Sequence, residues 1–327
     1  MIITDFTAGH IEAATQLARQ NYEKERGFIS VLPVADTMPD LKPYAENGLG
    51  VAAFESDEMV GFLCSVTPFK NAFRSTDATG VFSPMGANGA IGGNRAKVYA
   101  RLYQAAGEKW VCAGASSHAV CLYAHDREVQ DQFFRYGFGL RCVDAIRGMD
   151  KIAAPPCEGY SFSELASKTV LKVLSLENML DDSYIDSPFF MYRERNRKSA
   201  FLKDYEYFQS VYFIAEQDGR IVAFIRAELD GETFIQDTPG YLHVKGAYCL
   251  PEHRGKGLNQ KLLSLLIQKL KTKGYTRLGV DFESINPTAY GFWLKYFDAY
   301  THSVVRRIDE KIFGGAEYAA SRNTTDR

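Results

Sequence analysis

The most informative segment of this chain is Cys249-Leu-Pro-Glu-His-Arg-Gly-Lys-Gly-Leu-Asn259. It contains the end of an apolar run, a short basic loop with two glycines, and the start of a long amphipathic helix. This order gathers free backbone N–H groups and the positive end of a helix dipole, which favours binding of phosphate or pyrophosphate. Gly255 and Gly257 let the backbone approach an anion, because a Cβ would stand in the way. Arg254 and Lys256 add positive charge.

The residues after this loop predict a helix, a strand, a helix and a strand. Apolar side chains recur at helical spacing from Leu258 to Leu270. A strand is expected over 278–282, and Asn286 is placed to cap a helix over 287–296. The last strand candidate is 303–306.

A β-hairpin is expected before the loop. Two apolar runs, 211–216 and 221–226, flank Asp218-Gly219. Asp-Gly is a favoured two-residue hairpin turn because both of its residues tolerate a positive φ.

Together these elements resemble the GNAT acyltransferase superfamily, whose acetyl-CoA signature is Gln/Arg-x-x-Gly-x-Gly/Ala. Arg254 fills the first position and Gly257 the fourth, whereas Asn259 stands where glycine or alanine is usual. The family's next helix opens with Asn-x-x-Ala, and Asn286 matches its first residue. The resemblance covers residues 205–306.

The first half of the chain resembles a degenerate copy of the second. Hairpin, helix and strand signals follow in the same order over 51–124, and Phe138 matches Phe297 at an offset of 159 positions. These repeats predict an internal duplication. The glycine loop is missing from the first copy, because Arg95-Ala-Lys-Val98 stands where Arg254-Gly-Lys-Gly257 does.

The resemblance implies an α/β (α+β) chain of two tandem GNAT-like domains, each a mixed, mainly antiparallel twisted sheet flanked by helices. The predicted domains are a degenerate one over 1–152 and an acetyl-CoA-binding one over 158–327. The linker is expected at 151–160, where Pro155-Pro156 cannot continue a helix.

Composition narrows the class of protein. A net charge of −2 over 327 residues gives no general attraction to nucleic acid or anionic membranes. The N-terminus has no signal-peptide pattern, and the six cysteines form no Cys-x-x-Cys pair. We therefore expect a cytoplasmic protein with buried thiols, no metal and no membrane span. The oligomeric state stays open.

The resemblance implies an N-acyltransferase that moves an acetyl group from acetyl-CoA directly to a primary amine. One N–H near Cys249 or Leu250 would polarise the thioester carbonyl. The CoA contacts implied by the family motif are Cys249, Leu250, Arg254, Gly255, Lys256, Gly257, Leu258, Asn259 and Asn286.

The family often takes its general base from the CoA-binding strand, which here offers His243 and Lys245. Alternation places His243, Lys245 and Cys249 on one face, barring a bulge between them. Histidine suits proton transfer near neutral pH. Glu283 and Asp281 on the neighbouring strand are further candidates, and they could equally bind a cationic acceptor or face solvent.

The family's usual acid is a tyrosine seven residues after the helix-opening asparagine, and Trp293 stands there. Either Tyr290, one turn earlier, protonates the leaving thiolate, or the thiolate leaves unassisted. Trp293 also keeps open a non-catalytic acyl-CoA-binding or regulatory protein.

Aminoacyl transferases of the Fem kind, which also pair GNAT-like domains, are a third alternative, but the intact CoA loop argues against them. The acceptor is expected to be a small-molecule or peptide amine of unspecified identity.

Overall fold

The computed structural model describes residues 1–74, 78–231 and 233–313. The chain forms two compact units that exchange segments. Unit 1 contains residues 1–24, 37–141 and the described residues from Ser303 onward, and unit 2 contains residues 25–36 and 142–302. The sequence predicts two consecutive domains, 1–152 and 158–327, and it does not predict this interleaving.

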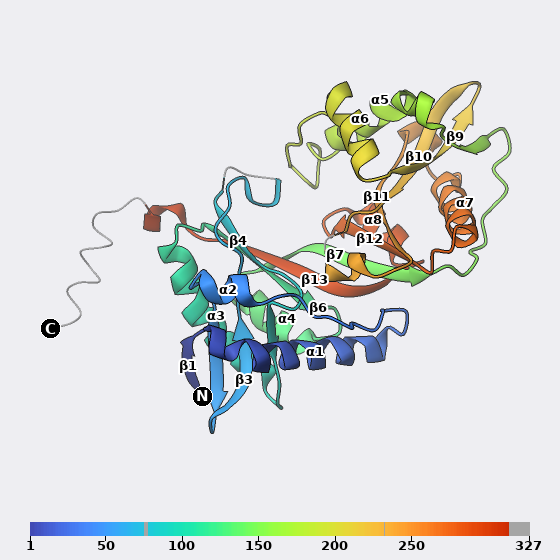
Figure 1. Ribbon diagram of the computed structural model, residues 1–327. Helices are drawn as coiled ribbons and strands as arrows, with labels where there is room; N and C mark the ends of the chain where they lie inside the picture. Colours follow the sequence, from blue (N-terminus) through green and yellow to red (C-terminus); the bar gives the residue numbers. More distant parts are fainter. Residues whose placement is uncertain (75–77, 232, 314–327) are drawn as a thin grey trace. The chain divides into compact units, whose positions relative to one another are not determined.

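Unit 1 combines a small antiparallel sheet, a second group of strands and two long helices (Figure 1). Its elements are β1 (Ile2–Asp5), α1 (Ile11–Phe28, of which the first part lies here), α2 (Lys42–Glu46), β2 (Val51–Glu55), β3 (Glu58–Leu63), β4 (Gly80–Ser83), β5 (Asn88–Ala90), α3 (Arg95–Cys112), β6 (Ser117–Tyr123), α4 (Arg127–Arg135) and the end of β13 (Asp298–Arg307). The antiparallel sheet has the order β1-β2-β3-β5, and the second group has the order β4-β6-β13.

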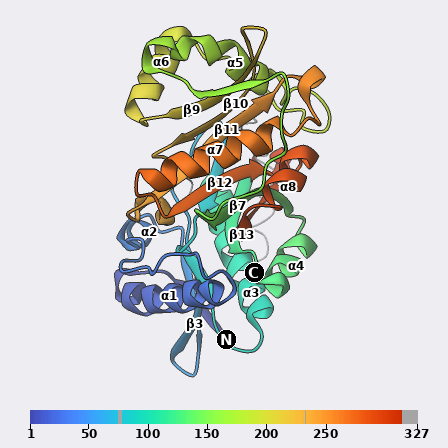
Figure 2. The ribbon, with the colours of Figure 1, turned by 90° about the vertical axis from the view of Figure 1, so that its right-hand side faces the viewer.

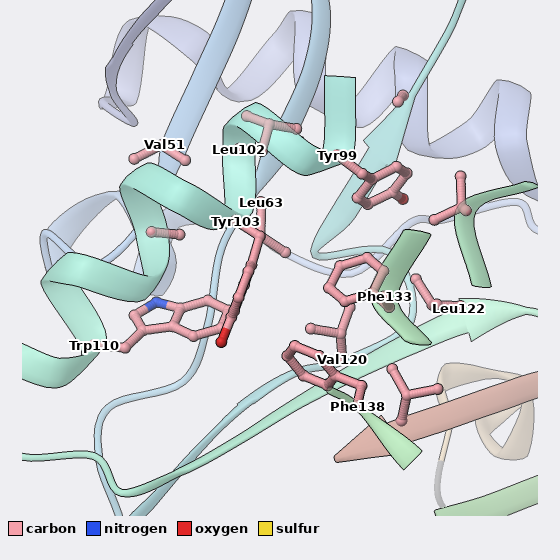
Figure 3. Close-up of a cluster of buried hydrophobic side chains, with 14 of the residues drawn as sticks. Val51, Leu63, Tyr99, Leu102, Tyr103, Trp110, Val120, Leu122, Phe133 and Phe138 are labelled. Atoms are coloured by element: carbon pink, nitrogen blue, oxygen red, sulfur yellow. The ribbon is translucent and has the colours of Figure 1, made fainter. Parts of the chain in front are cut away.

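The core of unit 1 is built on α3, which begins at Arg95 and ends at Cys112. Asn94 caps α3 by accepting the N–H of Lys97 at 3.1 Å. Figure 3 shows aromatic side chains gathered beside this helix, with the Tyr103 ring edge-on to Phe138 at 5.0 Å between centroids. The fully buried Trp110 donates its indole N–H to the Leu49 carbonyl at 3.1 Å.

Unit 2 is a mixed sheet with helices on both faces (Figure 2). Its elements are β7 (Gly139–Gly148), β8 (Ser161–Glu164), α5 (Leu174–Asp182), α6 (Lys198–Tyr207), β9 (Val211–Gln217), β10 (Arg220–Glu228), β11 (Tyr241–Cys249), α7 (Leu258–Thr272), β12 (Arg277–Glu283) and α8 (Pro287–Trp293). The strand order is β7-β12-β11-β10-β9-β8, and β11–β12 is its one parallel pair among the described residues. Because residues 142–148 of β7 pair with β12, the chain enters unit 2 well before residue 152.

Most of the expected elements of unit 2 are confirmed. The β9–β10 hairpin turns at Asp218 and Gly219, which have φ of 52° and 75°. Helix α7 buries its periodic leucines against β9, β10 and β11, whereas α5 packs on β10 and β11 from the other face. Helix α8 ends at Trp293, three residues before the expected end.

The structure therefore has the fold class that the sequence implies, with mixed, mainly antiparallel sheets flanked by helices. The duplication of the two halves stays a prediction.

Candidate functional site

The loop between β11 and α7 has the backbone geometry of an anion cradle. Gly255 and Gly257 both have φ of +78°, in the left-handed region that L side chains rarely adopt. Gly257 is the N-cap of α7, and its carbonyl accepts the N–H of Lys261 at 3.0 Å. The first N–H groups of a helix lack intrahelical partners and carry its positive end. Since Gly255 and Lys256 are exposed, this end of a 15-residue helix is open to a phosphate.

The first turn of α7 also offers an acceptor. Leu258 is 2% exposed and belongs to the core, so a ligand would meet its N–H and not its side chain. The side-chain oxygen of Asn259 is buried and has no hydrogen-bond donor within the described residues. Leaving a buried acceptor unpaired costs about 1–3 kcal/mol, so a donor from a ligand would be favourable here. CoA carries both phosphates and amide N–H groups, and it fits this pair of features.

Residues 152–160, hereafter the linker strap, do more than join two domains. They lie along the start of α7, where Gln260 Nε2 donates to the Ala153 carbonyl at 2.7 Å. Ser264 Oγ donates to the Ile152 carbonyl at 3.3 Å. The strap is therefore fixed to the helix whose N-terminus forms the cradle.

The strap also explains one of the two loop glycines. A Cβ added to Gly257 would stand 2.3 Å from the Cγ of Pro155, whereas a Cβ added to Gly255 would meet nothing within 4 Å. Gly257 is thus required for close packing of the strap in addition to its backbone conformation. The motif alone accounts for Gly257 only through anion binding, because it does not reveal Pro155.

Tyr160, at the end of the strap, holds two basic side chains of the loop. Its hydroxyl lies 2.9 Å from His253 Nδ1 and accepts from Lys256 Nζ at 3.1 Å. The Cys157 thiol donates to the Lys256 carbonyl at 3.6 Å. Sequence reasoning missed these partners, since Tyr160 and Lys256 are 96 positions apart and no spacing signals their contact.

The sheet opens beside the loop. Parallel pairing joins Tyr241–Val244 of β11 to Arg277–Val280 of β12 and stops there, although both strands continue. On the other side, β11 stays paired with β10 and carries a bulge at Lys245. A bulge bends a strand and increases its twist, which separates β11 from β12.

At the end of β11, successive backbone N–H groups point alternately towards β10 and towards this opening. The Leu250 N–H donates to the Val222 carbonyl of β10 at 2.9 Å, so it is already used. Successive N–H groups of a strand point to opposite sides, and the Cys249 N–H therefore points away from β10. Arg254 Nε donates to the Cys249 carbonyl at 3.0 Å on that same side. Burial raises the pKa of the Cys249 thiol to about 11, so it is not a nucleophile at neutral pH.

His243 is 1% exposed, and both of its ring nitrogens are engaged. Nδ1 lies 2.6 Å from the Tyr241 hydroxyl, and Nε2 lies 2.8 Å from Asp281 Oδ1. Burial raises the pKa of Tyr241, so its phenol stays protonated. The ionised Asp281 carboxylate can only accept, so Nε2–H donates to it. The bulge at Lys245 also breaks the simple alternation expected between His243 and Cys249.

Asp281 joins this buried pair to Lys245. Lys245 Nζ lies 3.4 Å from Asp281 Oδ1. Burial raises the pKa of the Asp281 carboxyl, but the hydrogen bond from His243 and the charge of Lys245 outweigh burial and hold the pKa well below its usual range. Gly279 leaves the space for the network, because a Cβ there would stand 1.8 Å from the Tyr241 hydroxyl. The structure thus brings His243 and Asp281 together, which sequence reasoning treated as alternatives.

Glu283, at the end of β12, is ion-paired with Arg193 at 3.2 Å. The Arg193 guanidinium lies 3.8 Å above the ring of Tyr184. Glu283 therefore has a structural partner that the sequence does not reveal.

The residues of α8 differ in accessibility. Asn286 caps the helix by accepting the N–H of Ala289 at 3.0 Å, so its side-chain oxygen is committed. Tyr290 is 38% exposed and packs edge-on against Phe282. Trp293 is 6% exposed and packs against Phe297, as a core residue does.

The described residues contain no group of three or more side chains placed to hold a metal ion. None of their helices is both long enough and apolar enough to cross a membrane.

Comparison with known proteins identifies relatives of this arrangement. Residues 175–299 match the acetyltransferase (GNAT) family. No curated protein sequence matches the chain significantly.

Solved structures share the fold over most of the chain. A GCN5-related N-acetyltransferase from Sphaerobacter thermophilus is 12% identical, with a TM-score of 0.56 over 94% of this chain and 95% of that one. A GCN5-related glucosamine N-acetyltransferase region of a fungal multi-domain GH3 β-N-acetylglucosaminidase is 14% identical, with a TM-score of 0.53 over 93% of this chain and 38% of that one. At such identities the likeness concerns the fold alone.

Proposed function

Because residues 175–299 form a domain of the GNAT acetyltransferase family, we propose that this chain is an acetyl-CoA-dependent N-acetyltransferase acting on a primary amine. The observation that carries the proposal is the opening of the sheet. Pairing of β11 with β12 ends at Val244, and the rest of β11 then leads to the glycine loop without a β12 partner. An extended thioester arm needs such an opening, because its amides can then pair with free strand groups.

The binding roles follow from this geometry. The N–H groups of Gly255–Asn259 hold the pyrophosphate, with Arg254 and Lys256 supplying charge. The pantetheine arm runs along β11, and Asn286 is a further contact. Of the two N–H groups considered for the thioester carbonyl, that of Cys249 is proposed, since that of Leu250 donates to Val222.

The reaction forms an N–C bond and breaks the C–S bond. The neutral amine attacks the thioester carbon, and the Cys249 N–H stabilises the oxyanion. The cationic nitrogen of the tetrahedral intermediate then loses its proton to Asp281, and the intermediate collapses to the amide and CoA thiolate. In this scheme His243 acts through Asp281, and Tyr290 returns a proton to the thiolate.

A second reading, a non-catalytic acyl-CoA-binding protein, is favoured by Trp293. A buried indole cannot protonate a thiolate, and its N–H is not acidic. This reading and the first share the CoA loop and differ only in turnover.

The test measures binding and turnover separately. Calorimetry with acetyl-CoA is followed by thiol release over a panel of amino acids, a peptide N-terminus, polyamines, amino sugars and aminoglycosides. Mass spectrometry then identifies the acetylated product. Binding with turnover supports the transferase, binding without turnover on any amine supports the alternative, and no binding overturns both.

A matched pair of variants assigns the binding to the loop. Gly255→Glu puts a carboxylate in the cradle and should abolish binding. Gly114→Glu makes the same change at a glycine that also has positive φ (83°) and open space, in unit 1. It should leave acetyl-CoA binding unchanged.

A further inference from the structure

Unit 1 contains a cavity of about 540 Å³ that has no part in the acetyl-transfer scheme. This size lies within the range of about 300–1,000 Å³ typical of small-molecule sites. The second half of α3 forms one wall, and the end of β13 with the residues after it forms another. Its apolar lining includes Val111, Ile308 and Ile312.

The floor of the cavity carries hydrogen-bonding groups that are neutral. Tyr103 and His118 are both buried, and the Tyr103 hydroxyl lies 3.0 Å from His118 Nδ1. His118 Nε2 lies 3.1 Å from the Ala115 carbonyl. Burial, together with the charge of Arg306, lowers the pKa of His118 to about 4, and burial raises the pKa of Tyr103 to about 12.

Arg306 is consequently the cation of this cavity. Its guanidinium hydrogen-bonds Tyr103, and within residues 1–74, 78–231 and 233–313 it forms no ion pair with a carboxylate. Glu108 also lines the cavity but is exposed. A half-buried guanidinium in an apolar cavity is stabilised when an anion joins it.

The glycine at position 107 supports the view that the cavity volume is kept open for a ligand. It lies inside the 18-residue helix α3, where glycine costs about 1 kcal/mol relative to alanine. A Cβ added there would come no closer than 3.5 Å to any atom, which is ordinary contact with the Tyr103 ring. Packing of the protein therefore does not require a glycine at this position, and a larger side chain would project into the cavity.

We propose that this cavity binds a small amphipathic carboxylate, with the carboxylate on Arg306 and the apolar body against Val111, Ile308 and Ile312. This site is independent of the acetyl-transfer reaction proposed for unit 2. It assigns unit 1, which lacks the glycine loop, a ligand of its own.

Calorimetry on the full chain tests the charge requirement with three probes of one chain length, octanoate, 1-octanol and octylamine. We expect saturable binding of octanoate alone. Arg306→Gln should weaken it by at least about tenfold, as loss of a charge-assisted hydrogen bond does. Arg101→Gln, which changes an exposed arginine of α3 outside the cavity, should leave it unchanged.

A second pair of variants tests whether octanoate binding needs the volume of the cavity. Gly107→Leu fills the cavity and should abolish octanoate binding, whereas Gly107→Ala should retain it. Both substitutions raise helix propensity, so thermal unfolding should show that neither loses stability. Equal binding of octanol, no binding of octanoate to the unaltered chain, or octanoate binding that survives Gly107→Leu would each overturn the proposal.

Discussion

Pro155 lies directly against Gly257, so that a Cβ on the glycine would stand 2.3 Å from the proline Cγ. The contact fixes the linker strap to the helix N-terminus that is proposed to hold the CoA pyrophosphate. It also gives the loop two requirements for glycine, a positive φ and a close approach.

These two requirements can be separated by substitution. Gly255→Ala meets only the positive φ and should cost about 1–2 kcal/mol of unfolding free energy. Gly257→Ala has the same φ of +78° and also clashes with Pro155, so it should cost about 1–3 kcal/mol more. Urea denaturation measures both.

Pro155→Gly provides the control. In the Gly257→Ala background it should recover most of the extra loss, because it removes the ring that the Cβ meets. If Gly255→Ala and Gly257→Ala are equally destabilising, the strap does not pack on the loop as described.

The Asp281–His243 pair should control turnover and not CoA affinity. Asp281→Asn should lower kcat by about 10²–10⁴-fold, as expected on removal of a general base. Asp230→Asn removes another carboxylate near Lys245, at 3.5 Å. It should change kcat by no more than about fivefold, because partly exposed ion pairs contribute about 1 kcal/mol or less.

The role of His243 is tested with two substitutions. If it acts through Asp281, His243→Gln should retain more activity than His243→Ala, because glutamine can still donate to the carboxylate. Equal and complete loss in both, with normal Asp281→Asn turnover, would return the base to His243 itself. Steady-state kinetics with acetyl-CoA titrations separates kcat from binding.

Tyr290 is expected to protonate the leaving thiolate. Tyr290→Phe keeps the ring on Phe282 and removes the hydroxyl, and it should lower kcat by about 10²-fold. Tyr207→Phe, at a tyrosine that is 76% exposed on α6, serves as the control. Unchanged turnover in Tyr290→Phe would mean that the thiolate leaves unassisted.

Glu283 is expected to contribute more to binding of the amine acceptor than to the chemical step. Its carboxylate is engaged by Arg193 at 3.2 Å, so Glu283→Gln is expected to raise KM for the amine and to leave kcat nearly unchanged. A fall in kcat of about 10²-fold at saturating amine would make Glu283 the base instead.

Unit 1 should lose stability in mild acid through His118. Its pKa falls from 6.5 to about 4 on folding, so the unfolded chain binds the proton more tightly. The stabilisation is complete above about pH 6.5 and is lost as the pH falls towards 4, by about 3 kcal/mol in all. His118→Gln should remove this part of the pH dependence when unfolding free energies are compared at pH 7.5 and 4.5. A wild-type curve that is flat between these values would contradict the assignment.

Local sequence patterns were sufficient to predict the loop, the long helix after it and the Asp218-Gly219 hairpin. Each of these depends on residues close together in the chain, through glycine conformation and side-chain periodicity. The same local signals identified the residues proposed to hold CoA. They also indicated that the first half of the chain has no glycine loop.

The contacts that those residues make depend on tertiary packing. The strap reaches the loop from 96 positions away, and the bulge at Lys245 arises in the pairing of β11 with β10. Tertiary packing also buries His243 between Tyr241 and Asp281 and pairs Glu283 with Arg193. Periodicity specifies which face of an element is apolar, but it does not specify which distant polar group will meet a given side chain, because that depends on the register and packing of the whole sheet.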